Sequence, residues 1–440
     1  MGSKVLTLPP SNNKVILERD ETTLSEAKNV FRASSDAFPS WRATPFSQRR
    51  DILTKALCLI QERKHQLGEE LTLQMGRPIS FGVKEIEIET MQKRADYLLS
   101  IAEESLSPLP GQPEQGFQHW IEKEPFGPTL LVFAWNFPYL IIVNSLLPAL
   151  LSGNTVVLKP SPQTPLVAER LVEIFTEAGG LPKDVVQVIH TGNAETLREL
   201  VRIPDVNEPV RAGEPRGGND PAYVRTDADL KYVAEQLVDG AVFNAGQSCC
   251  AIERIYVHTD VHDEFVAEVQ KELAQYKLGD PADKNTNVGP VISRAAQASV
   301  NAQIQDALAK GAVNATPSNP TFVNPAAEGN YVIPTVLINL NHDMVVMKEE
   351  TFGPVIPIMR VSSDEEADPV AGEKLLKVLE AGTVFINRCD YPNPDLAWTG
   401  WKNSGTRHTL GPRGFDPFYK LKSYHIREKQ GWLFLSISLE

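Results

Sequence analysis

Residues 243–254 read Phe243-Asn244-Ala245-Gly246-Gln247-Ser248-Cys249-Cys250-Ala251-Ile252-Glu253-Arg254. They follow a helix-like run at 228–242 and precede an apolar run at 255–257 that is typical of a strand. At a junction between a helix and a strand, the side chain of a cysteine is held in a fixed direction, and backbone N–H groups point past its sulfur. Covalent catalysis on a carbonyl needs both a nucleophile and donors for the oxyanion that forms. The local sequence is equally consistent with a small buried residue that only closes a packing contact.

The totals of the chain exclude several classes of protein. Its 440 residues predict two or three domains, and its net charge of −13 speaks against nucleic-acid or membrane partners, which need a basic surface. Four scattered cysteines are too few for a disulfide framework, so a reducing, cytoplasmic location is expected. The pair Cys249-Cys250 lacks the spacing of a zinc site, so no metal is expected. The start of the chain lacks the pattern of a secretory signal, and the longest apolar run, 139–151, is too short to span a bilayer.

Hydrophobic periodicity predicts an α/β protein. Helical patterns occupy residues 23–38, 46–73 and 83–106, and a Pro-rich break then leads to an exposed strand or arm at 116–124. Short apolar runs at 129–133, 155–159 and 185–189 are each followed by a helical run, at 138–151, 166–177 and 194–201. This alternation predicts a doubly wound parallel sheet.

The carboxyl ends of these predicted strands carry groups that suit a nucleotide. Ligands of parallel sheets bind beyond those ends, and here the ends are followed by Trp135, Asn136, Lys159 and a turn at Gly192. No G-x-G-x-x-G fingerprint is present. After the cysteine stretch, helices are predicted at 262–275, 294–310 and 373–379, with strands at 355–359 and 383–386 and an edge strand at 431–440. This second α/β domain places the cysteine near the seam between the two domains.

Five motifs identify a resemblance to the aldehyde dehydrogenase superfamily across residues 27–426. They are Phe133-Ala134-Trp135-Asn136-Phe137-Pro138, Gly153-Asn154-Thr155-Val156-Val157-Leu158-Lys159-Pro160, Asn244-Ala245-Gly246-Gln247-Ser248-Cys249, Lys348-Glu349-Glu350-Thr351-Phe352-Gly353-Pro354 and Gly400-Trp401-Lys402-Asn403-Ser404-Gly405. The resemblance implies an aldehyde dehydrogenase-like α/β fold. Its expected parts are a cofactor domain (1–107 and 127–218), a catalytic domain (219–414) and an oligomerisation arm (108–126 and 415–440).

The resemblance also implies a chemistry. Cys249 would attack an aldehyde, Asn136 and the Cys249 N–H would stabilise the oxyanion, and hydride would pass to NAD or NADP, leaving a thioester that a glutamate-activated water hydrolyses. Lys159 would bond the adenosine ribose and Glu350 the nicotinamide ribose. The expected cofactor-binding set is Phe133, Ala134, Trp135, Lys159, Ser161, Gly192, Gly217, Glu350 and Phe352. Cys250 is expected to be a bystander, and Glu253 a solvated or salt-bridged charge.

The chain departs from the family pattern after residue 201. The family has a strand and turn there, then a helix, then Glu-Leu-Gly-Gly, whereas residues 203–207 run almost directly into 208–218. A strand plus crossover helix needs a dozen or more residues, for which no room is left. The missing helix N-terminus faces the cofactor pyrophosphate in the family, so weaker cofactor binding is expected.

The general base is displaced as well. Alignment on Gly217-Gly218 puts Pro215 where the family has its catalytic glutamate, with Glu214 one position earlier. Proline cannot take a proton, so Glu214 is the candidate base, although the following proline biases it toward an extended conformation. A second gap lies near 366–370, where the family has a Gly-Leu-containing strand.

Three functions remain open on the sequence alone. The first is an NAD(P)-dependent dehydrogenase of a small-molecule aldehyde, assembled as a homodimer or homotetramer. The second is a truncated, catalytically silent member of the family, and the third is a cofactor-independent thiol esterase. Pro162 stands at the family's coenzyme-selecting position and offers no group that distinguishes NAD from NADP.

Overall fold

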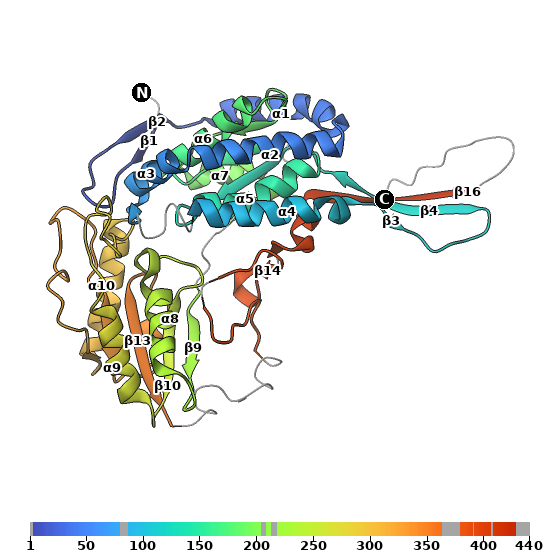
Figure 1. Cartoon of the computed structure of the whole chain (residues 1–440). Helices are drawn as coiled ribbons and strands as arrows, with labels where there is room; N and C mark the ends of the chain where they lie inside the picture. The colour runs from blue at the N-terminus through green and yellow to red at the C-terminus, as the bar shows by residue number, and fades with distance from the viewer. Residues whose placement is uncertain are drawn as a thin grey trace.

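The computed structural model describes residues 3–79, 87–203, 208–212, 218–362, 379–389, 391–405 and 408–427, with the backbone alone for 208–212. Figure 1 shows two lobes, one above the other, and an arm that extends away from them. Within the described residues, no helix combines the length and the apolar character that crossing a bilayer requires.

The first lobe is built on a parallel sheet with the strand order β7-β6-β5-β8. Its strands are β5 (Thr129–Phe133), β6 (Val156–Lys159), β7 (Val186–Val188) and β8 (Glu208–Ala212). Its helices are α1 (Leu24–Ala43), α2 (Phe46–Glu62), α3 (Lys64–Met75), α4 (Thr90–Leu106), α5 (Pro138–Leu151), α6 (Pro165–Glu177) and α7 (Ala194–Leu200). The alternation predicted from the sequence is confirmed, except that the helix expected at 46–73 divides at Arg63.

Helix α5 is apolar on every face because it is buried on every face. It packs against β5, α2, α4 and the 3-10 segment η6 (Pro412–Phe418), and every residue from Tyr139 to Leu151 except Ile141 is buried. Pro138 occupies its first turn, where a missing N–H leaves no bond unmade. The helix therefore begins at a defined residue, and Asn136 is held at the end of β5 just before it.

Strand β8 corrects one expectation. The sequence analysis left no room after α7 for a strand plus a crossover helix, yet a strand is present: β8 pairs in parallel with β5 from Thr129↔Glu208 to Phe133↔Ala212. The short α7 ends at Leu200, so the following residues are enough to return the chain to the sheet. Residues 213–217, which join β8 to Gly218, lie outside the described residues.

The second lobe has a five-stranded sheet with the order β11-β12-β13-β10-β9, parallel except for β11. Its strands are β9 (Asp220–Val224), β10 (Ile252–His258), β11 (Val313–Asn314), β12 (Thr335–Ile338) and β13 (Val355–Val361). Its helices are α8 (Leu230–Val242), α9 (His262–Leu273) and α10 (Arg294–Ala309). A second α/β unit, as predicted, therefore follows the first.

The strand predicted at 383–386 is not formed. Val384 and Ile386 are 39% and 66% exposed, and among the described residues no strand pairs with this apolar run. The second gap near 366–370, the helix predicted at 373–379 apart from Leu379, and the edge strand predicted at 431–440 lie outside the described residues.

The arm is a three-stranded antiparallel sheet with the order β16-β4-β3. Its strands are β3 (Leu109–Pro110), β4 (Phe117–Pro125) and β16 (Tyr419–Arg427). The strand expected at 116–124 is confirmed, and it pairs along its whole length with β16, near the far end of the chain. Short pairs β1 (Lys4–Thr7) with β2 (Leu17–Asp20), and β14 (Trp398–Thr399) with β15 (His408–Thr409), complete the described strands.

Candidate active site

Cys249 is presented by a sharply turned backbone. The 3-10 segment η2 (Phe243–Gly246) contains Asn244 at φ 52° and Ala245 at φ 56°, and Gly246 follows at φ 72°. The left-handed conformation is unfavourable for the two residues that carry a Cβ, so bonds elsewhere must hold it. After this turn the Cys249 side chain is exposed, whereas that of Cys250 is buried.

Glycine is required at position 246 by a second loop. A Cβ at Gly246 would lie 2.1 Å from the carbonyl oxygen of Gly353, so the two backbones are in direct contact. The loop before Gly353 carries Glu350 and Phe352, two of the residues predicted to bind the cofactor. The turn that presents Cys249 and this loop are therefore positioned as one unit.

Glu253 anchors the same loop. Its carboxylate is 5% exposed and accepts hydrogen bonds from the backbone N–H groups of Thr351 (2.7 Å) and Phe352 (2.9 Å). Burial raises the pKa of Glu253 to about 8, although the two N–H groups act in the opposite direction. The expectation of a solvated or salt-bridged charge was wrong, because β10 places this side chain inside the protein.

Two further carboxylates lie beside the cysteine backbone. A Cβ at Gly218 would lie 3.4 Å from the Cys249 carbonyl oxygen, 3.6 Å from Asp220 Oδ1 and 3.8 Å from Glu350 Oε1. Burial raises the pKa of Asp220 to about 6, while Arg254 opposes the shift. Burial also raises the pKa of Glu350, against a hydrogen bond from the Gly218 N–H. Sequence reasoning missed Asp220, for which no motif gives a signal.

The Asn136 carboxamide is directed at the cysteine stretch. It is 5% exposed, and its Nδ2 donates to the carbonyl of Gln247 at 3.2 Å, two residues before Cys249. Asn244 Nδ2 donates to the same carbonyl at 3.2 Å and to the Asn136 carbonyl at 3.3 Å. The end of β5 in the first lobe and the cysteine turn in the second are therefore held together by amides.

A buried ion pair supports both asparagines. Arg77 Nη1 and Glu87 Oε2 are 2.8 Å apart, with both side chains fully buried. Arg77 also donates to Asn244 Oδ1 at 3.2 Å and to the Asn136 carbonyl, and Glu87 Oε1 accepts from the Leu140 N–H at 3.0 Å. Nothing in the sequence pattern indicated this pair. Arg77 and Glu87 contact the segment after β5 and the turn before Cys249, and both segments are distant from the pair in the sequence.

Several predicted cofactor residues meet at the carboxyl ends of the strands. Trp135 and Phe352 form an edge-to-face pair with ring centroids 6.0 Å apart. Lys159, at the end of β6, is 8% exposed, burial lowers its pKa, and its amine has no hydrogen-bond or ion-pair partner among the described residues. An amine on a largely buried side chain is free to donate to a ligand here, and ribose hydroxyl groups are suitable acceptors.

Other predicted residues have different surroundings. Phe133 is 2% exposed and its side chain belongs to the core of the first lobe, and Ser161 Oγ accepts from the backbone N–H of Gln163 at 3.3 Å. Ala134 is partly exposed at the end of β5. Glu214 and Gly217 lie outside the described residues.

The turn at Gly192 is already bonded to a carboxylate. Glu21 Oε1 accepts from the N–H groups of Gly192 (3.2 Å) and Asn193 (3.1 Å) and from Thr191 Oγ1 (2.7 Å). Hydrogen bonds from Ser3 and Thr191 lower the pKa of Glu21 and favour its charged form. The Gly192 N–H is therefore paired within the protein.

Known proteins resemble this chain over nearly its whole length. Residues 2–213 and 215–373 match the aldehyde dehydrogenase family. The chain is 29% identical over 460 residues to a lactaldehyde dehydrogenase from Escherichia coli (strain K12), covering 95% of this chain and 94% of that protein. These matches do not favour the hypothesis of a truncated, silent family member.

Solved structures give the same result. The NAD+ complex of an aldehyde dehydrogenase from Bacillus cereus is 25% identical with a TM-score of 0.89, covering 97% of this chain and 94% of that one. A succinic semialdehyde dehydrogenase from Streptococcus pyogenes in complex with NADP+ is 26% identical with a TM-score of 0.87, covering 96% and 99%. The fold predicted from the sequence is thereby confirmed, and both of these neighbours were solved with a nicotinamide cofactor bound.

Proposed function

The chain belongs to the aldehyde dehydrogenase family, and on that premise we propose that it oxidises a small aldehyde with NAD or NADP through the thiol of Cys249. One observation supports the assignment of the catalytic roles to Cys249 and Asn136. An exposed thiol follows a strained turn, and the Asn136 carboxamide is hydrogen-bonded to that same turn at 3.2 Å. A nucleophile and an oxyanion donor are thus held close together by a hydrogen bond between two segments, as acyl chemistry requires.

The proposed reaction has two stages: oxidation of the aldehyde to a thioester on Cys249, and hydrolysis of that thioester. The Cys249 thiolate forms a bond to the aldehyde carbon, and the carbonyl electrons move onto oxygen, where the second hydrogen of the Asn136 amide and the Cys249 N–H donate to it. The nicotinamide cofactor, when bound, accepts the hydride released from this carbon. Water then attacks the resulting thioester, a carboxylate takes its proton, and the acid leaves as the thiolate re-forms.

The cofactor would be held by groups from both lobes. We assign Lys159 to the adenosine ribose, Glu350 to the nicotinamide ribose, and Trp135 with Phe352 to the ring. The remaining proposed lining residues are Phe133, Ala134, Ser161, Gly192 and Gly217. The Lys159 side chain, which is largely buried and whose amine has no partner among the described residues, supports this arrangement. The Gly192 N–H, in contrast, is bonded to the Glu21 carboxylate and is unavailable to a phosphate.

We expect Lys159→Met to raise KM for NAD or NADP about tenfold or more, with a smaller change in kcat. The ammonium would lose hydrogen bonds to the ribose, and a hydrogen bond to a charged group contributes about 1.5–3 kcal/mol. Initial-rate kinetics at saturating aldehyde measure the effect. Lys183→Met, at an exposed lysine of the same lobe, is the matched control. An unchanged KM would remove Lys159 from the cofactor site.

The proton acceptor is proposed to be Glu214, with Asp220 as the competitor, because Asp220 is partly buried and lies near the Cys249 backbone. We expect Glu214→Gln to release one equivalent of NAD(P)H per active site in a burst and then turn over about 10²-fold or more slowly, because the thioester accumulates. Rapid mixing monitored by NAD(P)H absorbance measures burst and steady state. Asp220→Asn is the matched variant, and a burst confined to it would transfer the role to Asp220.

The remaining assignments follow from surface and composition. We propose the cofactor domain as 1–107 and 127–218, the catalytic domain as 219–414, and the arm as 108–126 and 415–440. The arm supports assembly as a homodimer or homotetramer, because Leu421 and Ile426 on its edge strand are 59% and 43% exposed. Free thiols at all four cysteines support a cytoplasmic location.

A further inference from the structure

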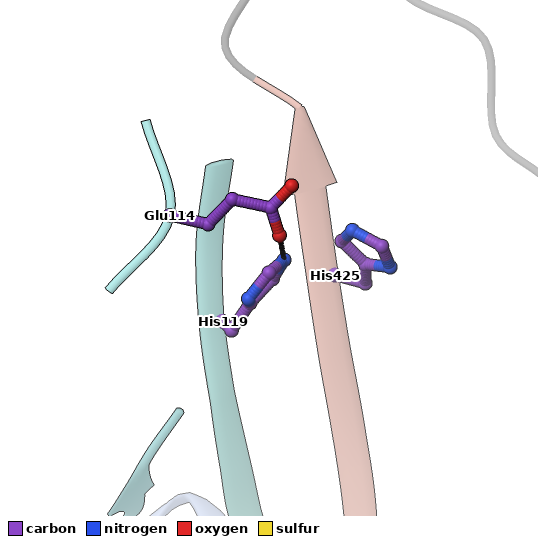
Figure 2. Close-up of side chains that lie close together, drawn as sticks. All are labelled: Glu114, His119 and His425. Carbon is purple, nitrogen blue, oxygen red and sulfur yellow. Dashed lines mark ion pairs between the residues drawn. The ribbon is translucent and has the colours of Figure 1, made fainter. Parts of the chain in front are cut away.

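Two histidines and a glutamate meet on the arm, outside the proposed active site. Figure 2 shows the side chains of Glu114, His119 and His425 converging from the turn before β4, from β4 and from β16. One ligand atom from each residue lies within 4.8 Å of the other two. Glu114 and His425 are exposed and His119 is partly exposed, so an ion in solution has access to the first two side chains.

The pairing of the two strands fixes the histidines opposite each other. His119 on β4 and His425 on β16 are direct cross-strand partners, and such partners have Cβ atoms about 4.5–5.5 Å apart on one face of the sheet. Their rings are edge-to-face with centroids 4.2 Å apart. Phe117 lies against both rings, with centroids 5.7 Å and 5.2 Å away. The separation of the imidazoles therefore follows from backbone register.

A tight turn brings the third group to this pair. The Phe117 N–H donates to the Glu114 carbonyl at 3.1 Å, and Gly116 adopts φ +81°, so the chain reverses just before β4. Glu114 Oε2 then lies 3.8 Å from His119 Nε2. This distance is too long for a hydrogen bond, and His119 Nε2 is buried without a hydrogen-bond partner. The ring nitrogen thus faces the carboxylate at ion-pair distance without a hydrogen bond to it (Figure 2).

The donor set identifies the class of ion that would fit between them. Zinc binds imidazole nitrogen at about 2.0–2.1 Å and carboxylate oxygen at about 2.0–2.2 Å, and two histidines with one glutamate and a water form a known tetrahedral set. Magnesium and calcium require mainly oxygen ligands, six or more for calcium. One carboxylate and two imidazoles therefore favour a borderline transition metal.

We propose that Glu114, His119 and His425 bind one divalent ion of the zinc class and thereby clip β16 to β4. The exposed side chains of Glu114 and His425 close on the ion by small changes of rotamer, while β4 and β16 stay in register. The ion joins residues that are far apart in the sequence, so its binding stabilises the arm by linkage. The site is separate from the thiol and the cofactor groups, so it stands independently of the proposed function.

Cobalt(II) titration of the untagged, full-length protein tests the site. The wild type should bind one more Co²⁺ than His119→Gln or His425→Gln, with visible d–d absorption typical of nitrogen and oxygen ligands. Zn²⁺ should displace that ion and Mg²⁺ should not. His65→Gln, at an exposed histidine on α3, is the matched control and should keep the wild-type stoichiometry. Equal stoichiometry in all four proteins would overturn the proposal.

Three further measurements test the site, and the first of them separates it from the exposed thiols of Cys58 and Cys249. In the first, the Co²⁺ that the histidine variants fail to bind should show no sulfur-to-metal charge-transfer band in the wild type. If that ion shows such a band, its ligands include a cysteine, and the proposal is overturned. Glu114→Gln leaves both strand residues in place and should weaken Co²⁺ binding at least tenfold. Hydrogen exchange of the β16 amides should slow on Zn²⁺ addition in the wild type and in His65→Gln, but not in His425→Gln. Exchange that is unaffected in every protein would exclude the clip.

Discussion

Cys249→Ala will lower kcat/KM for aldehyde oxidation by at least about 10⁴-fold, the order of loss seen when a catalytic nucleophile is removed. Without the thiolate no thiohemiacetal forms, and the hydride has no tetrahedral carbon to leave. The exposed position of Cys249 after the strained turn predicts that the substitution acts on chemistry more than on folding. NAD(P)H formation from a panel of aldehydes measures the loss.

Cys250→Ala is the matched control for this experiment. Cys250 is 6% exposed and its sulfur lies 3.4 Å from Ser248 Oγ, so the substitution removes a neighbouring thiol that faces the interior. It should retain activity within about an order of magnitude, with some loss of stability from the small cavity. Comparable NAD(P)H formation by Cys249→Ala would discard the covalent mechanism. Ester hydrolysis that needs Cys249 but no cofactor would show the thiol acting alone.

Arg77→Met will destabilise the fold by about 3–5 kcal/mol, because it leaves the Glu87 carboxylate buried and unpaired. It will also lower kcat, since Arg77 donates to the Asn136 carbonyl and to Asn244 Oδ1. Loss of these bonds frees the carboxamide from its position against the cysteine turn. Denaturant unfolding and steady-state kinetics on the same samples measure the two effects.

A double-mutant cycle separates the ion pair from the positioning role. Replacing both Arg77 and Glu87 with apolar residues should recover much of the lost stability, because no buried charge remains, while kcat stays low. Glu199→Gln breaks an exposed pair with Arg202 of the same 2.8 Å length and should change stability far less. Full recovery of kcat in the double variant would show that the pair does not position Asn136.

The elements that the sequence predicted well are those with strong local signals. Strand β5 and helix α5 have the predicted bounds, because an apolar run followed by Pro138 leaves little choice of start. The helix expected at 46–73 divides at Arg63, where the backbone adopts φ −96° and ψ 7°. Periodicity continues across this break, so the pattern by itself does not reveal it.

The errors in prediction concern pairing between distant segments. The apolar run at 383–386 has a strand-like composition but no neighbouring strand, whereas 208–212, which contains Pro209, pairs with β5. Strand formation depends on an available partner edge as well as on composition. The prediction for residues 203–218 rested on the length of that segment. It did not take into account that one edge of β5 was available to pair with another strand.

Local chemistry was determined by the sequence alone: the cysteine after a glycine turn, the amine at the end of β6, the aromatic and acidic residues of 348–354, and the alternation that makes an α/β fold. The tertiary structure decided which groups from distant parts of the chain meet. It buries Arg77 against Glu87, turns Glu253 onto the backbone of Thr351 and Phe352, and sets His119 opposite His425. These contacts depend on register and burial across lobes and strands, which no local pattern of residues encodes.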